Sequence, residues 1–289
     1  MTELVKRTLS GAVFVSCVVC SILWSPYVFS LLFMLIAVWA VDEYHRLVQS
    51  SGKLRIFAGL GTLFLWLMLM CFATHGENGE TYVAFGYAAG FAYLAIIIIA
   101  LLDEIWNHSG QPLQNWGNVL ISQMMIAVPL GTLMFLYRLD KWLLLALFVL
   151  IWTNDTGAYC VGSLTAKRPN GNHKMAPHVS PKKSWEGLIG GFVFAVIASL
   201  ILRQCGWFDV ITSSSFGLLV AAVFALLVSA FGTMGDLMES LLKRSIGVKD
   251  SGAFLPGHGG VLDRFDSILL ASPVITAFCW LCYFAAPLF

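Results

Sequence analysis

The sequence predicts an all-α polytopic integral membrane protein with eight or nine transmembrane helices and a polar site on its cytoplasmic side. Three observations lead to this prediction. Hydrophobic residues make up 58% of the 289 residues, and the mean hydropathy is +0.81. These residues gather in long runs, and a membrane-spanning helix needs about 20 mostly apolar residues. Lys and Arg are concentrated in alternate connecting segments, which is typical of a multi-pass protein.

Nine apolar segments qualify as spans, and nine is the preferred count. The first two are short and meet at Ser25-Pro26, which predicts a helical hairpin and leaves the count at eight or nine. Runs this long lack the alternation of a membrane barrel, so strands are not expected. In chain order the predicted spans cover residues 9–25, 26–41, 56–74, 82–102, 119–137, 142–162, 185–202, 216–234 and 267–287.

The distribution of positive charge predicts the orientation. If the N-terminus is cytoplasmic, 14 of the 17 Lys and Arg residues fall on inside segments, and only Arg138, Lys141 and Arg203 lie outside. This asymmetry follows the positive-inside rule. We therefore expect a multi-pass protein of the cytoplasmic (inner) membrane, with its N-terminus and the loops 163–184 and 235–266 in the cytoplasm.

The chain is expected to form a single membrane domain over residues 1–289, whose two parts differ in polarity. Residues 1–140 are mostly span with short polar joints and predict a membrane scaffold. Residues 141–289 hold four polar elements, each beside the cytoplasmic end of a predicted span. Their convergence on one leaflet predicts one composite site, so we expect the second half to be catalytic.

The longest polar run lies between the last two spans. Residues 235–266 contain five acids and four bases, although only 11% of the chain is charged. Charge beside lipid is costly, which favours a functional site. Within this run, residues 236–246 predict a short amphipathic helix, and one of its faces carries Asp236, Glu239, Ser240 and Lys243. Glu239 and Lys243 alone are also consistent with a helix-stabilising pair.

Carboxylates in this half suggest a metal site. Asp263 and Asp266 lie one turn apart after a glycine-rich loop, and Asp236 joins them from another helix. Such hard oxygen ligands suit Mg²⁺. Asp155 is predicted in the cytoplasmic third of span six, where an acid needs a cation or a water-filled cavity. It is assigned to a second cation, the alternative being a structural pair with a lysine. In the glycine-rich loop, His258 is either a ligand contact or an ordinary polar residue.

The loop 163–184 carries five bases and no acid, so it is expected to attract anions. Ser184 is a predicted N-cap with Glu186 in the first turn, and Lys182 and Lys183 precede it. A helix N-terminus behind two lysines predicts a phosphate site. For Lys167 and Arg168 simple membrane anchoring is the favoured interpretation. Mg²⁺ together with such bases is typical of phosphoryl or nucleotidyl transfer.

The run from Ser240 to Asp266 resembles the signature of the phosphatidate cytidylyltransferase family, also called CDP-diacylglycerol synthases. Asp155-Thr-Gly-Ala-Tyr and the segment 180–187 are similar to upstream motifs of that family. The chain departs from it at Asn154, where the family often has Ala, and in the extra stretch within 167–173. The matching signature positions are Ser240, Lys243, Arg244, Lys249, Asp250, Gly252, Pro256, His258, Gly259, Gly260, Asp263, Arg264 and Asp266.

This resemblance implies an enzyme that condenses CTP with phosphatidic acid, giving CDP-diacylglycerol and pyrophosphate in phospholipid biosynthesis. The implied cofactor is Mg²⁺ with a second cation, and the implied partners are CTP, phosphatidic acid, membrane lipid and a second copy of the chain in a homodimer, with no nucleic acid. The residues assigned to catalysis are Asp236, Asp263, Lys243 and Arg264. The residues assigned to metal binding are Asp236, Asp263, Asp266 and Asp155. The residues assigned to substrate binding are Lys182, Lys183, Ser180, Ser184, Ser240, Arg244, Lys249, Asp250, His258, Gly259 and Gly260.

Two other functions fit parts of the pattern. A CTP-dependent polyprenol or lipid kinase would need similar charges, but it would transfer only the terminal phosphate. An ion-coupled transporter would use Asp155 and would show inverted repeats with interrupted helices in both halves. Polar clusters occur only in the second half, which disfavours the transporter.

Overall fold

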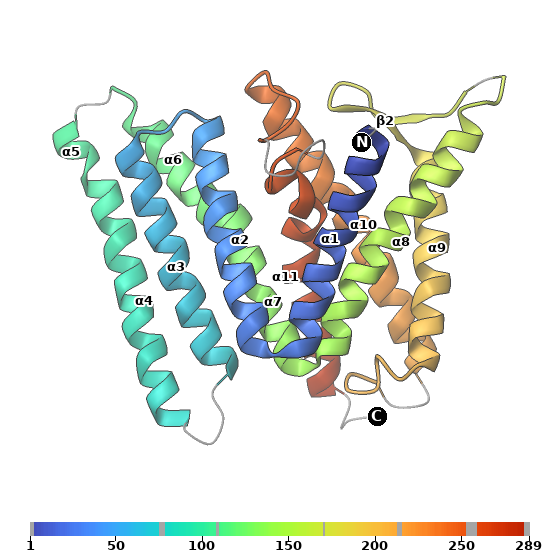
Figure 1. Ribbon diagram of the computed structural model, residues 1–289, viewed down its shortest axis with the longest axis horizontal. Helices are drawn as coiled ribbons and strands as arrows, with labels where there is room; N and C mark the ends of the chain where they lie inside the picture. Colours follow the sequence, from blue (N-terminus) through green and yellow to red (C-terminus); the bar gives the residue numbers. More distant parts are fainter. Residues whose placement is uncertain are drawn as a thin grey trace. The chain divides into compact units, whose positions relative to one another are not determined.

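The computed structural model consists almost entirely of helices (Figure 1). It describes residues 3–74, 79–107, 110–169, 171–212, 216–252 and 259–285. The chain divides into two compact units. The first comprises Met1–Arg138 and Asp250–Phe265, and the second comprises Leu139–Lys249 and Asp266–Phe289. A short segment from late in the sequence thus belongs with the N-terminal helices.

The first unit is a bundle of long apolar helices, in which α2, α3 and α4 run side by side (Figure 1). Ser25 separates the first two helices and caps the second, because its hydroxyl accepts a hydrogen bond from the Tyr27 N–H at 3.3 Å. The helices are α1 (Glu3–Trp24), α2 (Pro26–Leu47), α3 (Gly52–Thr74), α4 (Gly79–Leu102), α5 (Glu104–Asn107), α6 (Pro112–Ser122), the π-helical turn η1 (Gln123–Ala127) and α7 (Val128–Leu139).

The π-helical turn lies where a polar side chain enters the bundle. Gln123 is fully buried, and its amide donates to the Ala58 carbonyl and to the Thr62 hydroxyl, each at 3.2 Å. Nearby, the buried ring of His45 lies 3.1 Å from the Ser122 hydroxyl. Polar groups at membrane depth need such partners from neighbouring helices, because lipid offers none.

The second unit consists of α8 (Lys141–Thr165), strands β1 (Lys174–Ala176) and β2 (Ser180–Ser184), α9 (Trp185–Gln204), α10 (Gly217–Ser245) and most of α11 (Leu262–Ala285). Glycines bring α8 and α9 into close contact. A Cβ added to Gly157 would lie 2.7 Å from Phe194 Cβ, and one added to Gly191 would lie 2.5 Å from Asn154 Oδ1. Small residues of this kind let membrane helices approach closely.

The predicted fold class is confirmed. Each predicted span coincides with a helix, the fifth being α6, η1 and α7 in succession. Over the described residues, eight helices are long and apolar enough to cross a membrane, and the first span contributes a shorter apolar stretch, Ser10–Trp24. By length and composition this is an integral membrane protein.

Two local predictions were wrong. The segment 236–246 is not a separate amphipathic helix, because α10 continues without a break from Gly217 to Ser245. At ~1.5 Å per residue its 29 residues extend about 44 Å, so the helix is long enough to carry its polar end past the ~30 Å of a hydrocarbon core. Strands were not expected, yet β1 and β2 form a small antiparallel hairpin before α9.

Candidate active site

The second unit contains a cavity of about 480 Å³ beside the β-hairpin. Its walls come from α8, from the hairpin, from the start of α9 and from α10. Asp155 is exposed and lines this cavity. The charged residues of the lining are Asp155, Lys174, Lys182, Lys183 and Asp236.

The β-hairpin is held against the start of α9 by polar contacts. Ser184 ends the second strand and caps the helix, because its hydroxyl accepts from the Gly187 N–H at 3.1 Å. Glu186, in the first turn, lies 2.6 Å from the His173 ring nitrogen. The predicted cap is therefore confirmed. The buried Ser184 hydroxyl is occupied by this capping bond, while Lys182 and Lys183 precede it at the cavity.

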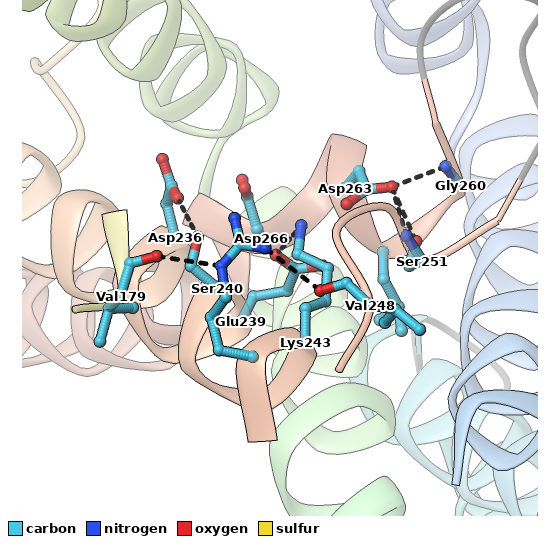
Figure 2. Close-up of polar contacts among 12 residues, drawn as sticks. Val179, Asp236, Glu239, Ser240, Lys243, Val248, Ser251, Gly260, Asp263 and Asp266 are labelled. Atoms are coloured by element: carbon cyan, nitrogen blue, oxygen red, sulfur yellow. Dashed lines mark hydrogen bonds and ion pairs between the residues drawn. The ribbon is translucent and has the colours of Figure 1, made fainter. Parts of the chain in front are cut away.

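An ion pair joins the hairpin to α10. Lys183 Nζ lies 2.7 Å from Asp236 Oδ2, and it also donates to the Thr233 carbonyl at 3.3 Å. On its other oxygen, Asp236 accepts from the Ser240 hydroxyl at 3.2 Å (Figure 2). Both side chains are largely buried, at 21% and 33% exposure. This contact unites two sequence motifs that lie about fifty residues apart.

Two further carboxylates, Asp155 and Asp266, lie near this ion pair. Asp155, Asp236 and Asp266 interact electrostatically with one another and with Lys183. A glycine lets α11 approach α10 here, since a Cβ on Gly235 would lie 2.5 Å from the Asp266 carbonyl oxygen. Within the described ranges, no three His, Cys, Asp or Glu side chains form a complete metal-binding group. Mg²⁺ nevertheless fits this donor chemistry, because it is usually held by one or two carboxylates together with substrate phosphates and water.

The bases at the end of α10 differ in their surroundings. Lys243 Nζ lies 2.5 Å from Glu239 Oε2, and the two side chains are only 11% and 2% exposed. The exposed Arg244 instead donates to the carbonyls of Val179 and Val248, each at 3.4 Å (Figure 2). The predicted Glu239–Lys243 helix pair is present, and it leaves Arg244 as the more accessible cation.

Asp263 belongs to the first unit, where backbone and side-chain donors hold it. Its Oδ2 accepts from the Gly260 N–H at 2.7 Å and from the N–H and hydroxyl of Ser251, both at 2.9 Å (Figure 2). Gly259 has a φ of 81°, and a Cβ on it would collide with the Asp263 carboxylate. This glycine is therefore required both by its backbone conformation and by the close approach of Asp263.

Sequence reasoning missed two polar residues near Asp263, Ser251 in the same loop region and Glu43 on α2. Glu43 lies on α2 and is only 6% exposed, yet it accepts hydrogen bonds from residues near the start of α11. The one available signal was an acid close to the cytoplasmic end of a predicted span, in a segment that otherwise suggested scaffold.

The remaining predicted residues divide as follows. Lys249 and Asp250 are exposed and lie on either side of the boundary between the two units, and Arg264 is exposed on the first turn of α11. Ser180 is half-buried at the start of β2. His258 lies outside the described residues, as does Pro256 of the signature. The second unit thus brings together Asp155, Asp236, Asp266, Lys182 and Lys183, and the first brings together Gly259, Gly260 and Asp263.

Comparisons with known proteins identify the family of the chain. A sequence profile described as the Cytidylyltransferase family matches residues 5–282. The phosphatidate cytidylyltransferase of Haemophilus influenzae is 32% identical, over 94% of this chain and 97% of that protein. That of Bacillus subtilis is 30% identical, over 95% and 97%. That of Pseudomonas aeruginosa is 43% identical over 52% of each chain.

Proposed function

The chain belongs to the cytidylyltransferase family, and we propose that it acts as a phosphatidate cytidylyltransferase. It would condense CTP with phosphatidic acid to give CDP-diacylglycerol and pyrophosphate. The observation that carries the proposal is the similarity over almost the whole chain to two proteins of that name. The cavity lined by paired acids and bases supports it, because both substrates are phosphate anions.

The reaction needs little covalent chemistry from the protein. A phosphate oxygen of phosphatidic acid attacks the α-phosphorus of CTP, the bond from this phosphorus to the bridging oxygen breaks, and pyrophosphate leaves. The attacking oxygen is already anionic, so no strong general base is required. Catalysis then depends on holding two anions together in line and on neutralising the developing charge. Lysines and carboxylates around one cavity provide groups of the right kind.

The acids are assigned to Mg²⁺, which would neutralise phosphate charge when bound. Asp155, Asp236 and Asp266 cluster in the second unit and supply carboxylate oxygens of the kind that Mg²⁺ binds. Asp155 is assigned to a second cation. Asp263, held by its own set of donors in the first unit, keeps its predicted role as a ligand. These roles are proposed for the individual aspartates, and no single metal site that joins all four is implied.

The bases are divided between the two substrates. Lys182 and Lys183, at the cavity before the N-terminus of α9, are assigned to the phosphates of CTP. Arg244 is assigned to the headgroup of phosphatidic acid, because it is exposed beyond the apolar part of α10. Lys243, which the resemblance assigns to catalysis, is also assigned to this headgroup, although its pairing with Glu239 makes it less accessible than Arg244. Arg264 remains assigned to catalysis, and Ser180, Lys249, Asp250 and His258 to substrate.

The orientation and the oligomeric state are proposals from the sequence. We infer that the polar loops face the cytoplasm, because they hold most of the Lys and Arg residues. The lipid substrate and product would remain in the membrane, and CTP would enter from the cytoplasm. A homodimer stays a prediction.

The first prediction concerns the reaction itself. Purified protein is incubated with phosphatidic acid, Mg²⁺ and CTP labelled at either its α- or its γ-phosphate, and the lipids are extracted. We expect the α-label in the lipid fraction and the γ-label in water as pyrophosphate. A lipid kinase would give the reverse, with the γ-label in lipid, and an ion-coupled transporter would label no lipid.

The second prediction concerns the metal. Asp236→Asn and Asp263→Asn should each lower turnover about 100-fold or more, because a catalytic metal contributes several kcal/mol of transition-state stabilisation. Asp209→Asn is the matched control, since Asp209 is 67% exposed and pairs with Arg203. Initial rates measured against Mg²⁺ concentration test the assignment. Near wild-type turnover with unchanged Mg²⁺ dependence would remove either aspartate from the ligand set.

The third prediction separates the bases. Lys182→Gln should raise the KM for CTP about 10-fold, and Arg244→Gln should raise the KM for phosphatidic acid by a similar factor, since a hydrogen bond to a charged group contributes about 1.5–3 kcal/mol. Lys167→Gln, an exposed lysine near the same hairpin, is the control for lost surface charge. Equal shifts for both substrates in both variants would indicate one shared anion-attracting surface instead.

The fourth prediction concerns orientation. Single cysteines replace the exposed residues His178 and Ser245 in a variant that lacks the seven native cysteines. Both should resist membrane-impermeant thiol reagents in intact cells, and both should react after the membrane is opened. Thr81→Cys, at the exposed start of α4, should react in intact cells and serves as the opposite control. Labelling of His178→Cys and Ser245→Cys from outside would reverse the orientation.

A further inference from the structure

Glu43 is a buried carboxylate in the part of the chain that the sequence assigns to scaffold. It lies near the C-terminal end of α2 and is 6% exposed. A buried carboxylate is strongly destabilising unless hydrogen bonds or an opposite charge compensate it. The partners of Glu43 come from more than two hundred residues away, at the loop that precedes α11. Its burial is therefore tied to that loop.

The carboxylate of Glu43 collects three donors. Its Oε2 accepts from the Val261 N–H at 2.9 Å, and its Oε1 accepts from the Leu262 N–H at 3.1 Å and from the Ser251 hydroxyl. Leu262 is the first residue of α11, so its N–H has no acceptor within the helix. Glu43 thus caps α11 from another helix, and its negative charge also suits the positive end of the helix dipole.

Two glycines of the loop are explained by this carboxylate. A Cβ on Gly252 would lie 2.9 Å from Glu43 Oε2, and a Cβ on Gly260 would overlap Glu43 Oε1 more severely. The backbone at Gly252 and at Gly260 therefore lies close against the Glu43 carboxylate. Gly260, which the resemblance assigns to substrate, is thus also required for close approach to a side chain of the same chain.

Glu43 and Asp263 share one partner, the Ser251 hydroxyl, and the other donors to Glu43 directly follow Gly260, a donor to Asp263. Ser251 donates its N–H and presents its hydroxyl to Asp263 Oδ2, both at 2.9 Å, and the Gly260 N–H donates to it at 2.7 Å. A hydroxyl has one proton, so Ser251 can donate it to only one of the two carboxylates at a time. The two backbone N–H donors hold Asp263 in either case. Displacing Glu43 would release the Ser251 hydroxyl and the N–H groups of Val261 and Leu262, and so would loosen the backbone on both sides of the donors to Asp263.

We propose that Glu43 is a positioning residue for Asp263, acting through Ser251 and through the backbone at the start of α11. This inference rests on the proposed role of Asp263 in the Mg²⁺-dependent reaction. Groups that orient a metal ligand usually matter almost as much as the ligand itself. The N-terminal helices would then contribute to catalysis by holding a carboxylate in place, in addition to spanning the membrane.

The test uses the full chain and compares Glu43→Gln with Asp42→Asn. Asp42 is the neighbouring acid on α2, and it pairs with Arg46 and Arg55 at 2.7 Å, away from the loop. Glu43→Gln should lower kcat about 10- to 100-fold and raise the Mg²⁺ concentration that gives half the maximal rate, as loss of an orienting partner does. Asp42→Asn should leave both quantities close to wild type.

Hydrogen exchange supplies a readout that does not depend on turnover. In Glu43→Gln, the amides of Ser251, Gly260, Val261 and Leu262 should exchange faster, while those of α3 and α4 keep their wild-type rates. Ser251→Ala removes only the hydroxyl link, so it should reproduce part of the Mg²⁺ effect and serves if Glu43→Gln does not fold. In the double variant Glu43→Gln/Ser251→Ala, the fold-loss of kcat should be smaller than the product of the two single losses, because the two residues act through one network.

Three outcomes would overturn the positioning role. The first is unchanged turnover and Mg²⁺ dependence in Glu43→Gln or, if that variant does not fold, in Ser251→Ala. The second is faster exchange spread over α3 and α4, which would mark Glu43 as a general stabilising residue. The third is a loss of kcat in Glu43→Gln/Ser251→Ala that equals the product of the two single losses. A wild-type protein that makes no CDP-lipid would instead overturn the proposed function, so the two failures are distinguishable.

Discussion

A charge among apolar helices must have a partner, and two sets of partners in this protein come from distant parts of the sequence. In the second unit, Lys183 of the hairpin pairs with Asp236 of α10. In the first unit, Glu43 of α2 collects donors from the loop before α11. Leaving one member of either set unpaired would cost several kcal/mol. These contacts therefore fix the β-hairpin against α10 and the start of α11 against α2, which apolar packing of the helices alone would not do.

Much of the fold could be predicted from the sequence because a membrane helix is recognised by one long run of apolar residues. Each apolar run became a helix, and Ser25 and Ser184 mark helix starts by the capping chemistry of their hydroxyls. The end of α10 could not be read in this way. Polarity rises sharply after Gly235, which suggested a new element, but no proline follows and the next residues favour helix. A change of solvent does not end a helix. The β-hairpin was missed because its three- and five-residue strands depend on tertiary contacts such as that between Glu186 and His173.

The candidate site could be predicted in its residue types but only partly in its geometry. The sequence indicated that Asp155, Lys183 and Asp236 belong together, and in the second unit they do. It gave no means of finding Glu43, because a hydrogen bond between residues 208 positions apart leaves no periodic or spacing signal. It also treated the loop glycines as one group. Gly259 allows a positive φ beside Asp263, whereas Gly252 and Gly260 make room for Glu43.

The bases near the site carry the same charge, but they differ in how exposed and how strongly paired they are, and therefore in how well each can bind an anion. The charge of Lys243 is paired with Glu239 in a setting almost closed to solvent, so an incoming phosphate would share this lysine with a carboxylate. Lys183 is also paired, but Asp236 is more open and faces a cavity. A bound cation could replace Lys183 as the partner of Asp236, and a bound anion could replace Asp236 as the partner of Lys183. The pair is therefore stable without ligands and remains complementary to a nucleotide phosphate that brings its own metal ion, as the proposed reaction requires.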